Sequence, residues 1–146
     1  MALIHAQTHS GFEIKESEPV SYNKRIVNIK NLLTLTYVII PIAAGVDKFL
    51  NLLTNWTKYL SPFVTNNIPI SQNVFMMIVG VIEITAGFIV ALKPKIGAYV
   101  VMAWLIAIAL QLLFSGMYMD VAVRDLGLAV GAYARARLNG YKYTND

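Results

Sequence analysis

Four long runs of apolar residues constrain the fold of this chain more than any other feature of its sequence. They lie at about residues 30–53, 75–92, 96–114 and 121–138. Each is close to the roughly 20 residues that an α-helix needs to cross the ~30 Å hydrocarbon core of a bilayer. A helix of a soluble bundle needs a polar face, and these runs lack one. The sequence therefore predicts four membrane-spanning helices.

The composition agrees with a lipid environment. Hydrophobic residues make up 57% of the chain and charged residues 14%, whereas charged residues make up about 25% of a typical soluble domain. A length of 146 residues leaves room for one domain. We therefore predict an all-α, integral membrane four-helix bundle over residues 22–138. Residues 1–21 are predicted to form a polar N-terminal arm and residues 139–146 a short polar tail.

The basic residues predict how this bundle is oriented. Most of the twelve lysines and arginines fall near the two ends of the chain or in the turn between the second and third runs. Segments rich in Lys and Arg stay on the cytoplasmic side of a membrane, so both termini are predicted to be cytoplasmic. On that side we count Lys15, Lys24, Arg25, Lys30, Lys93, Lys95, Arg135, Arg137 and Lys142, and on or toward the other side Lys48, Lys58 and Arg124.

Several classes of function are excluded by the sequence. The net charge is +4, but most basic residues flank apolar runs and form no solvated patch, which argues against nucleic-acid binding. The chain has no cysteine, which removes disulfides and thiol-based redox chemistry. His5 and His9 have the spacing of a metal-binding pair but no third ligand, so no metal site is predicted. No catalytic motif is visible.

Of the ionisable residues within the apolar runs or at their ends, five are predicted to form a cluster at a depth where a charge is costly. A rise of about 1.5 Å per residue places them within roughly two helical turns of one another, in the outer half of the bundle. Three interpretations stay open: the charges fix helix register only, they line a cavity for a ligand, proton or redox partner, or Lys48 and Asp125 reach the lipid headgroups. This predicted polar cluster consists of Asp47, Lys48, Glu83, Arg124 and Asp125.

Small residues predict which helix faces meet. Gly80 and Gly87 lie on one face of the second helix, together with Glu83. Gly127 and Gly131 have a GxxxG spacing on one face of the fourth helix, and such pairs allow close contact between helices. We therefore expect these four glycines at helix contacts, with the Arg124 face of the fourth helix pointing inward.

Three short motifs follow one another through the apolar region: AGVDKF at residues 44–49, GVIEITAG at 80–87 and RDLG at 124–127. In these motifs and their order over residues 30–138, the chain resembles the DoxX-type family of membrane proteins. The resemblance implies a four-helix protein of the bacterial inner membrane, often associated with redox systems. Some relatives are subunits of a thiosulfate:quinone oxidoreductase, and many have no assigned activity.

The function implied by this resemblance is that of an accessory subunit of a membrane redox or respiratory complex, with the polar cluster bordering a quinone or lipid site. Since the chain has no cysteine, a redox role would depend on a quinone or on the cofactor of a partner. The expected partners are membrane lipid and other membrane subunits or a second copy of the chain. Two alternatives stay open, a carrier of small molecules or protons and a non-catalytic scaffold or assembly factor.

Overall fold

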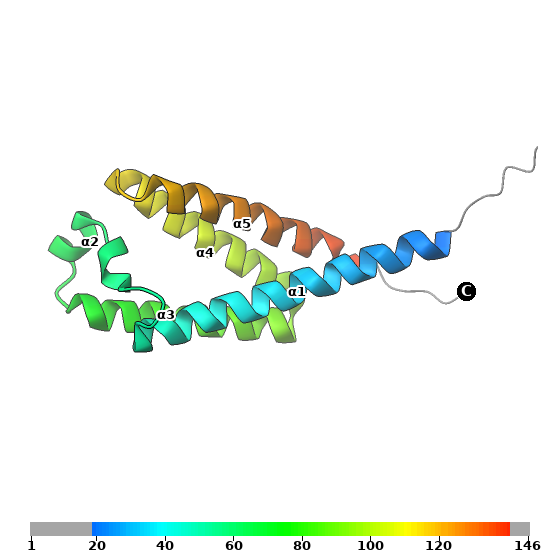
Figure 1. Ribbon diagram of the computed structural model, residues 1–146, viewed down its shortest axis with the longest axis horizontal. Helices are drawn as coiled ribbons and strands as arrows, with labels where there is room; N and C mark the ends of the chain where they lie inside the picture. Colours follow the sequence, from blue (N-terminus) through cyan, green and yellow to red (C-terminus); the bar gives the residue numbers. More distant parts are fainter. Residues whose placement is uncertain (1–18, 141–146) are drawn as a thin grey trace, which may run out of the picture.

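The computed structural model describes residues 19–140, and all regular structure in this range is helical (Figure 1). The fold of this region is therefore all-α, as predicted. The predicted tail from residue 141 onward and the N-terminal arm up to residue 18, with its two histidines, lie outside the described residues. The elements in chain order are α1 (Pro19–Leu50), η1 (Trp56–Tyr59), α2 (Pro62–Asn67), α3 (Gln72–Leu92), α4 (Pro94–Ser115), α5 (Met119–Arg137) and η2 (Leu138–Gly140).

Three of the helices are long and apolar enough to cross a membrane. They are the Lys24–Leu50 part of α1, the whole of α3 and the whole of α4. The fourth long helix, α5, does not meet the same standard, although the sequence predicts a span there. Its uninterrupted apolar segment runs only from residue 126 to residue 134. The charged residues that shorten it are Asp120, Arg124, Asp125, Arg135 and Arg137.

The ends of α3 and α4 follow from the local sequence. Ser71 precedes α3, and its hydroxyl accepts a hydrogen bond from the Val74 N–H, which satisfies one of the free donors of the first turn. Lys93 alone separates α3 from α4, and Pro94 begins α4 at a position where the missing N–H costs nothing. Gly116 ends α4 with a φ of +67°, a left-handed conformation that favours glycine.

The long helices are arranged as two pairs. Helix α1 packs mainly against α3, α4 packs mainly against α5, and the contact between α3 and α4 joins the two pairs. Figure 1 shows the α4–α5 pair diverging from the α1–α3 pair toward the end that carries α2, and α1 extending beyond the other helices at the opposite end. We call these the α2 end and the basic end of the molecule, the latter being the end where α1 begins, α3 turns into α4 and α5 finishes.

The four long helices meet in one core cluster. It contains Tyr37 from α1, Ala86 and Val90 from α3, Val101 from α4 and Ala132 from α5, each at most 5% exposed. The Tyr37 hydroxyl also donates a hydrogen bond of 2.6 Å to the Leu128 carbonyl of α5. A second cluster, nearer the α2 end, joins only α4 and α5 to η1; it is built on Ala109, Leu112 and Ala122, with Tyr59 and Tyr118 packed against it.

Glycines set the close approach of α1 and α3. A Cβ added to Gly45 would lie 2.6 Å from the Gly80 carbonyl oxygen, and a Cβ added to Gly80 would lie 2.6 Å from the Gly45 carbonyl oxygen. Gly87 is enclosed in the same way by Val38 and Ile42 of α1. Gly80 and Gly87 therefore lie at a helix contact that admits no larger side chain without movement.

The inward face of α5 differs from the predicted one. Gly127 is exposed, and a Cβ added to it would have no described atom within 4 Å, so the expectation that it packs against a neighbouring helix of this chain is wrong. Gly131 does lie at a contact, against the Tyr37 hydroxyl. The buried face of α5 is formed mainly by alanines, and it is rotated around the helix axis away from Gly127. The buried residues of α5 are Ala122, Asp125, Ala129, Ala132, Arg135 and Ala136.

Candidate functional site

A buried ion pair joins α1 to α3. Lys48 Nζ lies 2.5 Å from Glu83 Oε2, and the two side chains are 4% and 9% exposed. Lys48 lies in the last turn of α1 and Glu83 near the middle of α3. The close approach of Gly45 and Gly80 brings the two helices near enough for the pair to form. An ion pair this far from water is costly to break, because removing one partner leaves an uncompensated charge.

Trp56 covers this pair and connects it to Asp47. The Asp47 carboxylate accepts hydrogen bonds from the Trp56 indole N–H at 2.7 Å and from the backbone N–H groups of Leu52 and Leu53 at 2.9 and 3.1 Å. The face of the Trp56 ring contacts the Lys48 ammonium, with Nζ 3.8 Å from the ring centroid. Asp47 thus has three donors in place of a basic partner, and η1 is held over the ion pair.

The remaining two predicted cluster residues, Arg124 and Asp125, differ in burial. Asp125 is buried, with its side chain 9% exposed, and its charge interacts with those of Lys48 and Glu83. The Arg124 side chain is 65% exposed, and its Nε lies 3.6 Å from Asp125 Oδ1. The predicted inward orientation of Arg124 is therefore wrong, and Lys48 is the base that pairs with Glu83. Since Lys48 and Asp125 are both buried, neither reaches outward as one interpretation of the sequence proposed.

Both tryptophans of the chain flank the ion pair, and sequence reasoning missed them. Trp104 of α4 directs its indole toward α3, and its N–H interacts with the Glu83 carboxylate. The geometry falls short of a regular hydrogen bond, so Nε1 is buried and has no hydrogen-bond partner among the described residues. The signal in the sequence was a ring with an N–H donor inside the mostly apolar run at 96–114. Which group that donor meets depends on how α3 packs on α4.

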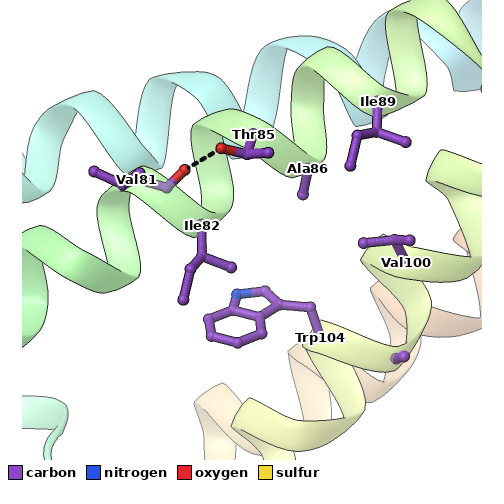
Figure 2. A pocket seen from close by; sticks show the side chains of 8 residues that line it. Val81, Ile82, Thr85, Ala86, Ile89, Val100 and Trp104 are labelled. Atoms are coloured by element: carbon purple, nitrogen blue, oxygen red, sulfur yellow. Dashed lines mark hydrogen bonds between the residues drawn. The ribbon is translucent and has the colours of Figure 1, made fainter.

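An apolar groove of about 480 Å³ lies between α3 and α4 (Figure 2). Val81, Ile82 and Ile89 line it from α3, and Val100, Ala103 and Trp104 line it from α4. Thr85 also faces the groove, but its hydroxyl donates to the Val81 carbonyl of its own helix at 2.8 Å. The volume is in the range of roughly 300 to 1,000 Å³ that is typical of small-molecule sites.

The Trp104 ring forms one wall of this groove, as Figure 2 shows, while its N–H points toward the charged cluster. The groove and the Lys48–Glu83 pair therefore lie on two sides of one side chain. Such an arrangement suits a molecule with an apolar body and a small polar head. Among residues 19–140, no group of three or more His, Asp or Glu side chains is close enough together to hold a metal ion.

Comparisons of the chain with protein-family models, with curated proteins and with solved structures found no match. The function is therefore argued from the site itself, because a fold alone does not determine a function.

Proposed function

We propose that the chain is an integral membrane protein whose groove between α3 and α4 binds a quinone, as an accessory subunit of a membrane redox complex. The observation that carries the proposal is the double position of Trp104, which lines the groove with its ring and interacts with Glu83 through its N–H. A quinone combines a ring that carries two carbonyl acceptors with a long apolar tail. The groove fits the tail, and a quinone ring placed on the Glu83 side of Trp104 would meet the indole N–H donor.

The Trp104 N–H is a suitable donor because its contact with Glu83 falls short of a regular hydrogen bond. A buried donor without an acceptor costs about 1 to 3 kcal/mol, which a ligand carbonyl can recover. The Lys48–Glu83 pair places charge on the far side of Trp104, whereas the groove itself is lined by apolar side chains, among them Ile89 and Val100. This gradient from polar to apolar favours a ligand with one polar end.

The redox role rests on the resemblance to DoxX-type proteins. Two of the three motifs that carry the resemblance supply the α1–α3 contact and its ion pair, through Gly45, Lys48, Gly80 and Glu83. The chain has no cysteine, so electrons would pass between the quinone and a cofactor of a partner subunit. The chain itself would bind and position the quinone.

We also propose that α5 crosses the bilayer with the other three helices and that the basic end is cytoplasmic, in a bacterial inner membrane. The shared core cluster of all four helices and the buried alanine face of α5 support the first point. The charge distribution supports the second, because segments rich in Lys and Arg remain in the cytoplasm. At the basic end lie Lys24, Arg25, Lys30, Lys93, Lys95, Arg135 and Arg137.

Two exposed alanines of α4 provide the test of quinone binding. Ala103 lines the groove, whereas Ala107, one turn further along α4, does not. In lipid nanodiscs a short-chain quinone should quench the tryptophan fluorescence of the wild-type protein in a saturable way. Ala103→Phe fills the groove and should abolish the saturable component, and Ala107→Phe should keep it. Equal quenching in both variants contradicts the proposal, and saturable quenching by a brominated phospholipid alone would assign the groove to lipid.

A scaffold role is the second candidate, and the Gly45–Gly80 contact favours it. The ion pair lies beside this contact and fixes the register of α1 on α3 whether or not a ligand binds. A scaffold requires the groove to have no preferred occupant. The Ala103→Phe variant would then assemble normally and bind the same partners as the wild-type protein.

A further inference from the structure

A second pocket lies at the basic end, between the start of α4 and the end of α5. It has a volume of about 390 Å³ and is lined by Lys95 and Tyr99 of α4, Ala136 and Arg137 of α5, and Asn139 of η2. Unlike the groove beside Trp104, it is lined mainly by polar side chains. The two hollows share no residue, so this pocket is separate from the proposed quinone site.

The pocket is positively charged. Lys95 and Arg137 line it, and the acidic residues of the described chain lie elsewhere, in the middle of the helices or toward the α2 end. Helix α4 begins beside the pocket and α5 ends there, so their two dipoles oppose each other and the charge of the pocket comes from Lys95 and Arg137. The four acidic residues between residues 19 and 140, all outside the pocket, are Asp47, Glu83, Asp120 and Asp125.

An exposed apolar stripe runs along α5 away from this pocket. Counting back along α5 from Arg137, every third or fourth residue is apolar, which places these residues on one face of the helix. They are Tyr133, Val130 and Leu126. Their exposed fractions are 47%, 69% and 37%. The pocket thus continues into an apolar surface on the side of α5 that no described helix covers.

We infer that this pocket binds the headgroup phosphate of an anionic phospholipid and that one acyl chain of this lipid lies along the Tyr133–Val130–Leu126 stripe. Lys95 and Arg137 provide the charges for the phosphate, and Tyr99 and Asn139 provide hydrogen-bond donors. Basic pockets between helices on the cytoplasmic side of membrane proteins hold such headgroups. The inference rests on the proposed insertion in a membrane. A free phosphate would fill the pocket but would not explain the adjoining stripe.

Native mass spectrometry of the full-length protein in mild detergent tests the inference. With equal amounts of phosphatidylglycerol and phosphatidylcholine, the wild-type protein should retain phosphatidylglycerol selectively. The double variant Lys95→Gln/Arg137→Gln should lose about 30-fold in this selectivity, since each basic residue near an anionic lipid contributes about fivefold. The control Lys24→Gln/Arg25→Gln removes the same charge from the basic end outside the pocket and should lose less than about threefold.

Three results would overturn the inference. Equal losses in the two double variants would mean a general attraction to the basic end, and equal retention of the two lipids by the wild-type protein would mean no preference for an anionic headgroup. Displacement of bound lipid by an excess of soluble glycerol phosphate would reassign the pocket to a free phosphate ligand. Quinone quenching by the Lys95→Gln/Arg137→Gln variant should match that of the wild-type protein, so failure of this inference is distinguishable from failure of the proposed quinone site.

Discussion

Lys48 of α1 and Glu83 of α3 form an ion pair at 2.5 Å, next to the point where Gly45 and Gly80 bring the two helix backbones together. The pair is buried in helices whose other inward groups are largely apolar. Such a pair contributes little net stability when both partners are present, but either partner left alone is strongly unfavourable. Stability and ligand binding can therefore be separated by the choice of substitution.

Glu83→Gln keeps the shape of the side chain and leaves the Lys48 ammonium without its counter-charge. We expect the free energy of unfolding to fall by about 3 to 5 kcal/mol. Thermal unfolding in detergent measures this as a lower midpoint. The double variant Lys48→Met/Glu83→Leu replaces both charges by apolar groups of similar volume and should restore most of the midpoint. An unchanged midpoint for Glu83→Gln alone would show that Lys48 does not need the charge of Glu83 for the protein to be stable.

Gly80 of α3 and Gly127 of α5 should respond in opposite ways to substitution by alanine. In Gly80→Ala the new Cβ meets the Gly45 carbonyl oxygen, so we expect a loss of about 1 to 3 kcal/mol in stability. In Gly127→Ala the Cβ meets no described atom, and the higher helix propensity of alanine should add up to about 1 kcal/mol. Comparison of the two unfolding midpoints checks the orientation of α5. A loss in Gly127→Ala as large as in Gly80→Ala would show that the Gly127 face packs against something.

Arg135 supplies a third prediction, because it is only 3% exposed and depends on Thr34 of α1. Its Nε donates to the Thr34 hydroxyl at 2.5 Å, and Nη1 has no hydrogen-bond partner among the described residues. Thr34→Val removes this acceptor and should lower the stability by about 1 to 3 kcal/mol. Thr36→Val is the matched control, since the exposed Thr36 hydroxyl bonds only to the Leu32 carbonyl of its own helix. Its effect should stay within about 0.5 kcal/mol. Equal unfolding midpoints for the two variants would mean that Arg135 does not need Thr34.

The sequence was most informative where hydrophobicity alone decides the structure. The apolar runs at 75–92 and 96–114 correspond to α3 and α4, which the structure places at Gln72–Leu92 and Pro94–Ser115. The burial cost of charge likewise predicted that Lys48 and Glu83 lie close together. In both cases a large energy term depends on residue type more than on detailed geometry.

The rotation of α5 and the role of the tryptophans could not be predicted in this way. Gly127 and Ala129 are both small, so a search for small residues does not decide between two faces of the helix. The structure buries the alanine face and exposes Arg124. Trp104 meets Glu83 only because α3 and α4 pack at one particular register, and Trp56 reaches Lys48 only through the path of the chain after α1.

The most direct test of the central claim compares the two tryptophans. Equilibrium binding of a labelled short-chain quinone would be measured in nanodiscs with Trp104→Phe and with Trp56→Phe. The first removes the proposed donor and keeps an aromatic wall, so the Kd should rise by at least about threefold, the loss of one hydrogen bond. The second removes the hydrogen bond to Asp47 outside the groove, so it should lower the unfolding midpoint and leave the Kd unchanged. A Kd for Trp104→Phe equal to that of the wild-type protein, or an equal rise in both variants, would contradict a quinone site at Trp104.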